Sequence, residues 1–168
     1  MSHSQLTAML DSLIADWSRE RPDLDIKHKE IVYAIHIARS LLTTNADQVL
    51  QKWNLSFNSY GVLATLRRSS APFEKAPTEL ANALGFTAGG MSNLLRRLES
   101  LNYIVRVRSA EDGRGVRVRL TTQGKRVVDE AATAVTRSEA NHLKVLSAPE
   151  QRRLYKSLRA IISSFGPG

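Results

Sequence analysis

The stretch that decides the fold is residues 87–119, which read TAGGMSNLLRRLESLNYIVRVRSAEDGRGVRVR. In its first half, apolar residues recur at three- and four-residue steps, which predicts an amphipathic helix with a polar and basic outer face. In its second half, Val and Arg alternate in two runs separated by a turn that contains Asp-Gly, a strong hairpin dipeptide. We therefore expect a helix followed by a basic β-hairpin.

Positive charge is concentrated in the same part of the chain. Residues 87–126 contain nine Lys or Arg and three Asp or Glu, a net charge of +6, whereas the whole chain of 168 residues carries +8. Such a concentration indicates a polyanionic partner. The alternative, a basic face that is merely solvated, leaves the basic hairpin without a role. We interpret the helix and hairpin as a winged helix-turn-helix that binds double-stranded DNA.

The expected recognition helix has two distinct faces at about 100° per residue. Five apolar residues fall on the inner side: Met91, Leu94, Leu95, Leu98 and Leu101. The outer side carries Gly89, Asn93, Arg96 and Ser100, flanked by Ser92 and Arg97. Gly89 and Gly90 each cost about 1 kcal/mol of helix stability relative to Ala. Their missing side chains would let a phosphate or base edge approach the helix start; the alternative is a poor helix start without function.

These considerations predict a set of DNA-contacting residues. Asn suits adenine edges and Arg suits guanine edges, while Arg114 at the hairpin tip fits a narrow minor groove. Asp112 would be repelled by phosphate and is expected to orient a neighbouring arginine. The predicted contacts are Thr87, Gly89, Gly90, Ser92, Asn93, Arg96, Arg97, Arg108, Arg114 and Arg117.

The alternation in the hairpin predicts one apolar and one basic face, because successive side chains of a strand point to opposite sides. We expect the apolar side chains to cover the core and the arginines to face outward. The inward set is Val105, Val107, Val116, Val118 and Leu120, and the outward set is Arg106, Arg108, Arg117 and Arg119.

The remainder of the chain is expected to be helical. Apolar periodicity and capping residues predict helices over residues 4–18, about 25–53, 56–68, 77–84, about 121–146 and from 148 onward, with residues 69–76 as a loop. The helix over 25–53 is apolar on more than one side, so a second subunit is expected to cover part of it. The predicted fold is mainly α with a small β-hairpin: a winged helix-turn-helix lobe (55–124) on a helical dimerisation bundle (1–54 and 125–168).

Composition limits the other function classes. The chain has no cysteine, which excludes disulfides and thiolate metal sites, and it has no apolar run of membrane-spanning length and no signal peptide, so we expect a cytoplasmic protein without a membrane partner. An enzyme has little support, because no glycine-rich phosphate loop follows a strand and the four histidines, at 3, 28, 36 and 142, are scattered. No cofactor is expected. A protein-interaction module would leave the arginine hairpin unexplained.

Three segments of the chain resemble the MarR family of bacterial transcriptional regulators over about residues 24–164. They are LSFNSYGVLATLRR, PTELANALGFTAGGMSNLLRRLESLNYI and DGRGVRVRLTTQG. The most specific part is the wing pattern D-x-R followed by V-x-L-T-x-x-G. The resemblance implies a homodimer on a pseudo-palindromic operator, usually repression, and release by a small, often aromatic or phenolic, anionic ligand bound between the dimerisation helices and the DNA lobe.

The N-terminal W…RPDLD resembles the subgroup with an extra first helix, which includes urate-responsive members. The chain departs from that subgroup at Gly61, where an acidic residue is expected, and at Leu94, where an arginine is expected; the wing tip has Gly113 in place of an arginine. The resemblance therefore does not extend to urate as the effector. Trp17, His36, Arg39, Tyr60 and Arg106 remain the ligand candidates. The alternative function is a ligand-independent, architectural or partner-controlled DNA-binding protein.

Overall fold

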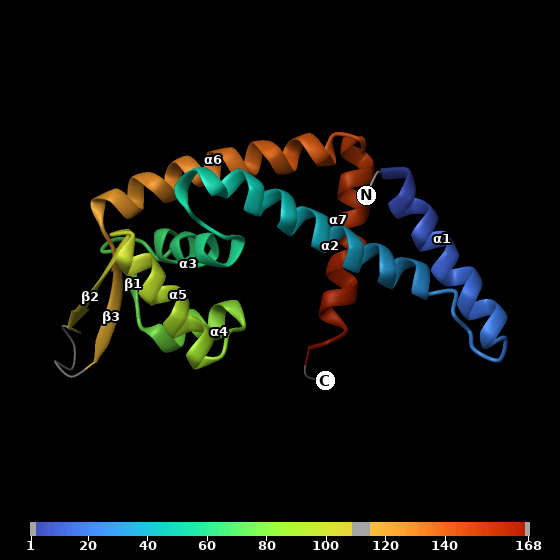
Figure 1. Ribbon diagram of the computed structural model, residues 1–168, viewed down its shortest axis with the longest axis horizontal. Helices are drawn as coiled ribbons and strands as arrows, with labels where there is room; N and C mark the ends of the chain where they lie inside the picture. Colours follow the sequence, from blue (N-terminus) through green and yellow to red (C-terminus); the bar gives the residue numbers. More distant parts are fainter. Residues whose placement is uncertain (1–2, 109–114, 167–168) are drawn as a thin grey trace. The chain divides into compact units, whose positions relative to one another are not determined.

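The computed structural model describes residues 3–108 and 115–166, with the side chains described from residue 8 onward. The fold is mainly helical with one small antiparallel sheet, as predicted (Figure 1). Within the described ranges, no helix combines the length and the apolar character needed to cross a membrane. The chain divides into two compact units, Met1–Asn45 and Ala46–Gly168, which are described separately.

The first unit contains α1 (His3–Glu20) and most of α2 (Lys29–Leu50). The predicted helix over 25–53 begins at Lys29, because residues 21–28 form turns in which Leu24 N donates to Arg21 O and Lys29 N to Ile26 O. The Lys29 ammonium lies 5.3 Å from the ring centre of Trp17 and 5.8 Å from that of Tyr33, at cation–π distance. Much of the apolar surface of α2 is exposed, at Ile31, Val32, Leu41 and Leu42.

The second unit holds the hydrophobic core. The end of α2 continues into a short 3₁₀ helix (Gln51–Trp53), and α3 (Phe57–Arg67), α4 (Pro77–Leu84), α5 (Ala88–Ser100) and α6 (Thr122–Leu143) pack with the sheet around it (Figure 1). Leu50 of α2 and Val128 of α6 are buried in this core. The core thus contains residues from both sides of the predicted domain boundaries, after residues 54 and 124. The division into dimerisation segments and a DNA-binding lobe at those boundaries stays a prediction.

The helix-turn-helix is set by local signals that the sequence contains. Pro77 begins α4, and the Glu79 carboxylate accepts a hydrogen bond from Ala76 N at 2.6 Å. Gly85, with φ of +68°, ends α4 in the left-handed region that favours glycine. Two residues later Thr87 caps α5 by accepting from Gly90 N at 3.2 Å. The two helices are therefore joined by a turn of fixed length.

The sheet has three strands rather than the two predicted. The strands are β1 (Glu74–Lys75), β2 (Ile104–Arg108) and β3 (Val116–Leu120), antiparallel and in the order β1-β3-β2. β1 lies in the segment predicted as a loop, and its two residues are too few to show the alternation that marks a strand. It pairs Glu74 with Arg119 and Lys75 with Val118.

The prediction for the faces of the hairpin was half wrong. Ile104 is opposite Leu120 and Arg106 is opposite Val118, so these residues share the inner face. Ile104 is buried, at 2% exposure, and determines which side chains of β2 face the core. Val105, the next residue, therefore lies on the outer face and is 42% exposed. The prediction was correct for Val118 and Leu120 of β3, which are buried, and for Arg117, which lies on the outer face. It was wrong for Val116, which is 46% exposed, and for β2.

The junction of β3 with α6 is tightly packed against the turn that precedes β2. Thr121 N donates to Tyr103 O at 3.1 Å, and the Thr121 hydroxyl donates to Asn102 O and accepts from Gly124 N. A Cβ placed on Gly124 would lie 1.8 Å from Tyr103 O, a backbone atom that cannot move aside like a flexible side chain. Gly124 is thus required for this close approach.

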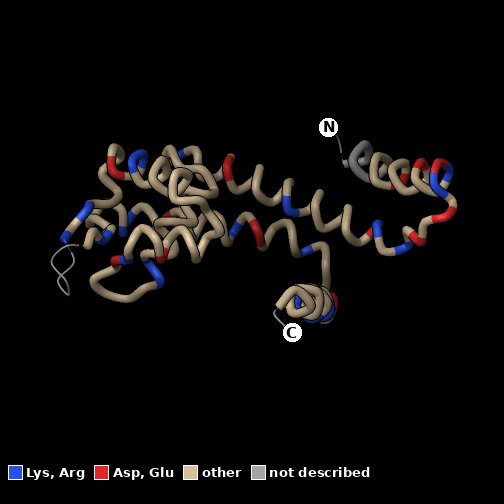
Figure 2. The backbone as a smooth tube through the Cα atoms, turned by 90° about the horizontal axis from the view of Figure 1, so that it is seen from below, with Lys and Arg blue, Asp and Glu red and all other residues tan. Residues whose placement is uncertain are grey.

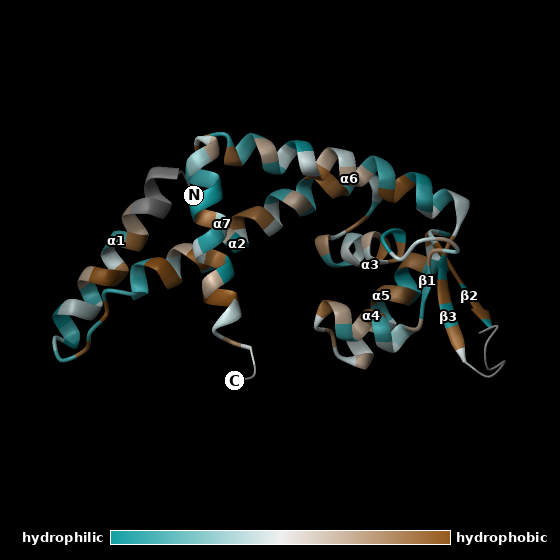
Figure 3. Ribbon diagram, turned by 180° about the vertical axis from the view of Figure 1, so that it is seen from behind, coloured by the Kyte–Doolittle hydropathy of each residue, from teal (hydrophilic) through white to brown (hydrophobic). Residues whose placement is uncertain are grey.

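The last helix, α7 (Ala148–Ser163), contributes nothing to the core. Its N-cap is Ser147, whose backbone N–H and hydroxyl donate to the Glu150 carboxylate at 2.7 and 2.5 Å. None of its residues is buried, and its hydrophobic segments alternate with hydrophilic ones along the helix (Figure 3). The exposed apolar residues in or just beyond α7 are Leu154, Tyr155, Ile161, Ile162 and Phe165.

We predict that Gly124→Ala destabilises the protein by at least about 2 kcal/mol, because the added methyl group overpacks a backbone contact. Gly61→Ala in α3 is the matched control: its Cβ would meet only Leu84 Cδ2, at 3.7 Å. That control should gain up to about 1 kcal/mol from helix propensity. Urea denaturation measures both values, and equal stability of the two variants would contradict the close approach at Gly124.

Candidate nucleic-acid interface

The predicted recognition helix is amphipathic as expected. Met91, Leu95 and Leu98 of α5 are buried at 1% exposure or less, which fixes the rotation of the helix. The opposite face is open to solvent, and its exposed residues are those that the angular analysis placed there: Gly89, Asn93, Arg96 and Ser100. The helix therefore presents a polar and basic face away from the core.

Two of these side chains form a pair. Arg96 Nη1 donates to Asn93 Oδ1 at 3.2 Å, one helical turn away. The contact restricts the rotamers of both exposed side chains before any partner binds. An amide and a guanidinium held together offer the donor and acceptor pattern that reads adenine and guanine edges in a major groove.

The start of α5 is open, and its two glycines have different surroundings. A Cβ on Gly90 would lie 3.3 Å from the Thr87 hydroxyl, which caps the helix, so the cap limits the size of this residue. A Cβ on Gly89 would meet nothing within 4 Å. No internal contact explains Gly89, which agrees with an approach from outside by a phosphate or base edge.

The other predicted DNA contacts occupy varied positions. Arg97 Nη2 donates to Asn54 O at 3.2 Å, and Ser92 is exposed beside the inner face of the sheet. Arg108 is exposed at the end of β2. Arg114 and Asp112 lie outside the described residues.

Arg117 is engaged in ion pairs. Its Nε lies 3.1 Å from Glu74 Oε1 and its Nη2 lies 3.7 Å from Glu79 Oε2, with 25% of the side chain exposed. Arg119 also pairs with Glu74, at 2.7 Å. Glu74 could not be predicted as a partner, because it lies about 45 residues from both arginines in a segment expected to be a loop. Arg117 as a DNA contact remains a prediction.

Lys and Arg are dense on the sheet and at the start of α6 (Figure 2). The described members of this basic set are Arg106, Arg108, Arg117, Arg119, Lys125 and Arg126. Three of them are ion-paired, Arg106 with Glu99 and both Arg117 and Arg119 with Glu74, so the formal charge of the wing overstates the charge available to DNA.

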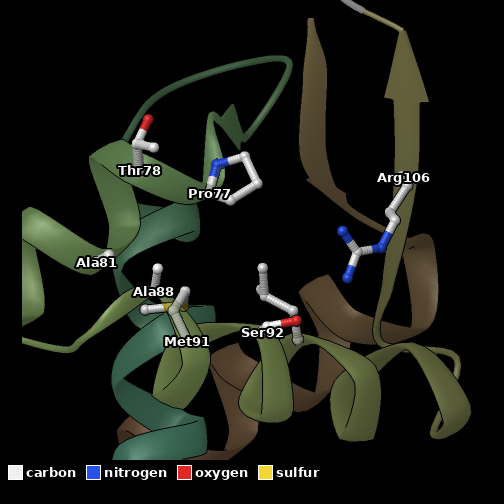
Figure 4. Close-up of a pocket in the computed structure, with 8 residues that line it drawn as sticks. Pro77, Thr78, Ala81, Ala88, Met91, Ser92 and Arg106 are labelled. Carbon is white, nitrogen blue, oxygen red and sulfur yellow. The ribbon is translucent and has the colours of Figure 1, made fainter.

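A small pocket of about 100 Å³ lies between α4, α5 and β2. Arg106 points from β2 toward it, while Pro77 and Ser92 line it from the two helices (Figure 4). Arg106 reaches this position because Ile104 fixes the inner phase of β2, and its Nε donates to Glu99 Oε2 at 3.1 Å. The remaining lining residues are Thr78, Ala81, Ala88, Met91 and Leu95. An arginine above apolar walls has the chemistry to hold an aromatic anion.

The other ligand candidates do not line this pocket. Trp17, His36 and Arg39 belong to the first unit and Tyr60 to the second. Burial raises the pKa of the Tyr60 hydroxyl above its ordinary value, the Glu139 carboxylate raises it further, and Arg68 opposes both. A ligand site that combines these residues remains a prediction.

Comparisons with known proteins agree with this geometry. A family model described as the MarR family matches residues 53–115. The chain is 28% identical over 145 residues to the HTH-type transcriptional regulator PecS of Dickeya dadantii, covering 86% of this chain and 87% of that protein. It is 26% identical over 129 residues to the HTH-type transcriptional repressor Mb2911 of Mycobacterium bovis, covering 77% of this chain and 91% of that protein.

Solved structures share the fold. The S. aureus MepR–DNA complex matches with a TM-score of 0.72 and 26% identity, over 80% of this chain and 97% of that chain. Sco3205 from Streptomyces coelicolor, a MarR family regulator in complex with DNA, matches with a TM-score of 0.74 and 24% identity, over 86% of this chain and 91% of that chain. Together with the family model and the two regulators, these similarities support a DNA-binding transcriptional regulator similar to the MarR family, whose members are regulators and not enzymes.

Proposed function

We propose that the protein is a dimeric, sequence-specific repressor that a small aromatic anion releases from its operator. The observation that carries sequence-specific binding is the Asn93–Arg96 pair on the exposed face of α5, beside an open helix start at Gly89. In a major groove, this face brings two base-reading side chains to adjacent base pairs. Backbone N–H groups at the helix start bind a flanking phosphate.

The hairpin supplies the second contact. Arg108 lies at the exposed end of β2, and in this proposal Arg114 at the tip enters the adjacent minor groove while Asp112 orients an arginine. Thr87, Gly90, Ser92 and Arg97 surround the reading face of α5 and contact the sugar-phosphate backbone. These assignments make α5 the source of sequence preference and the wing a source of affinity.

Dimerisation is supported by apolar residues that the single chain leaves exposed. Ile161 and Ile162 of α7 are 39% and 70% exposed, and Ile31 of α2 is 58% exposed. A helix of α7's composition that buries nothing needs a partner to cover its apolar face. A symmetric dimer places two copies of α5 on two half-sites, so the operator is pseudo-palindromic.

Repression is supported by analogy, since Mb2911 is named a transcriptional repressor. Release by a ligand is supported by the pocket beneath Arg106. A carboxylate replaces Glu99 on the Arg106 guanidinium, and an aromatic ring fills the apolar space beside Pro77 and Ala81. Because Ser92 and Met91 of α5 line the same pocket, an occupant changes how α5 sits against β2.

We predict that Asn93→Ala and Arg96→Ala each weaken binding to a selected operator by about 10- to 100-fold, the loss of one good base contact. Fluorescence anisotropy at fixed salt measures this. Arg159→Ala on the exposed surface of α7 is the control, because it removes the same charge far along the chain from α5. If Arg96→Ala and Arg159→Ala weaken operator binding equally, the loss of affinity is due to net charge and the proposed base contact of Arg96 is wrong.

We predict that benzoate-class acids weaken operator binding and that their neutral methyl esters do not, because the ion pair with Arg106 is required. Arg106→Met should abolish the response, whereas Glu99→Gln should strengthen acid binding by removing the competing carboxylate. Calorimetry and anisotropy measure binding and release. If no aromatic acid binds, or if the two variants respond alike, the pocket is not the effector site and the ligand-independent alternative is favoured.

A further inference from the structure

Glu74, Arg117 and Arg119 on the outer face of the sheet form a charged cluster with Glu79 of α4, here the Glu74 cluster. Lys75 Nζ also lies 4.0 Å from Glu79 Oε1. Arg119 Nε and Nη2 both lie 2.7 Å from Glu74 Oε2, and Arg117 Nε lies 3.1 Å from the other oxygen, Glu74 Oε1. One carboxylate therefore serves two arginines of β3, each oxygen facing one of them.

The Glu74–Arg117 pair is more shielded than an ordinary surface ion pair, whereas the side chains of Arg119 and Glu79 are 43% and 47% exposed. The Glu74 side chain is 15% exposed and that of Arg117 is 25% exposed. Arg117 Nε is buried, and among the described residues it has no well-aligned hydrogen bond, although the Glu74 carboxylate is 3.1 Å away. The negative charge of Glu74 thus stabilises the shielded Arg117 guanidinium, although Arg117 Nε makes no well-aligned hydrogen bond.

The cluster also joins the wing to the helix-turn-helix. Arg117 Nη2 lies 3.7 Å from Glu79 Oε2, the oxygen that accepts the hydrogen bond from Ala76 N at the start of α4. α4 packs against α5, and β3 is the central strand of the sheet. A chain of charges therefore runs from the wing strand through Glu74 and Glu79 to the beginning of the helix-turn-helix.

We propose that Glu74 is a specificity-determining positioning residue for DNA binding. By holding Arg117 and Arg119, it keeps two wing cations from binding phosphate and fixes the wing stem against α4. Operator affinity then depends more on base contacts by α5 than on ion pairs with phosphate, which form equally well on DNA of any sequence. This inference rests on the proposed sequence-specific binding through α5.

The proposal has a quantitative consequence for salt dependence. Each phosphate that a cation neutralises adds about 0.9 to the slope of log K against log salt. If loss of the Glu74 charge frees both arginines, the slope for random-sequence DNA steepens by up to about 2. At about 0.1 M salt, affinity for random DNA then rises at least about fivefold, and the ratio of operator to random-DNA affinity falls.

The test compares Glu74→Gln with Asp129→Asn. Both variants raise the net charge by one and release an arginine, because Asp129 pairs with Arg67 at 2.8 Å between α3 and α6, whereas the arginines held by Glu74 belong to β3. We expect a steeper random-DNA slope and a lower specificity ratio for Glu74→Gln only. The triple variant Glu74→Gln, Arg117→Gln, Arg119→Gln should return the slope to the wild-type value. Equal slopes for Glu74→Gln and Asp129→Asn would overturn the proposal.

A measurement on the wild type covers the case in which Glu74→Gln does not fold. The arginine Nε–Hε resonances are followed by NMR while random-sequence duplex is added. We expect the Arg96 resonance to shift and those of Arg117 and Arg119 to stay in place, and shifts of the latter two would overturn the proposal. The affinity of the wild type for the operator, measured in the same titrations, tests the proposed function separately. If the wild type does not prefer the operator, sequence-specific binding through α5 is refuted. The salt slope of Glu74→Gln on random DNA is measured without the operator and tests the role of Glu74 alone.

Discussion

Burial of one apolar stripe of α5 is the constraint on which the interface depends. Met91, Leu95 and Leu98 each remove most of their side chain from water, a gain of about 1.5–3 kcal/mol per residue. Rotating the helix to present another face would expose them, so packing energy selects which residues meet a partner. Asn93 and Arg96 face outward because the leucines face inward. The candidate DNA-reading surface is therefore the part of α5 that the core leaves exposed.

A second constraint is the register of the hairpin. Ile104 is buried against the core and opposite Leu120, and this one pairing sets the face of every other residue in β2. Arg106 is thereby turned inward to the pocket between α4 and α5, whereas Arg117 of β3 faces outward to Glu74. The same register thus separates the wing arginines: Arg106 lines a candidate effector pocket, and Arg117 and Arg119 share the Glu74 carboxylate on the outer face.

Features fixed by neighbours in sequence could be predicted from it. The faces of α5 depend on residues within four positions, and the structure confirms the predicted buried side. The cap at Thr87 and the left-handed Gly85 are equally local features. The inward phase of β2 was predicted wrongly because Val-Arg alternation is identical in either phase, and only Ile104 and the partner strand decide between them. The Glu74 cluster joins residues about 45 positions apart through a two-residue strand, so no local pattern indicated it.

The central claim is that the outward face of α5 reads base sequence in a symmetric pair of half-sites. Selection of bound duplexes from random DNA, by the wild type and by Asn93→Ala and Arg96→Ala, tests it most directly. The account predicts inverted half-sites about one helical turn apart for the wild type. Each variant should lose base preference at one or two positions in both half-sites, with the spacing kept. Recovery of the same sequence preferences by all three proteins would contradict it.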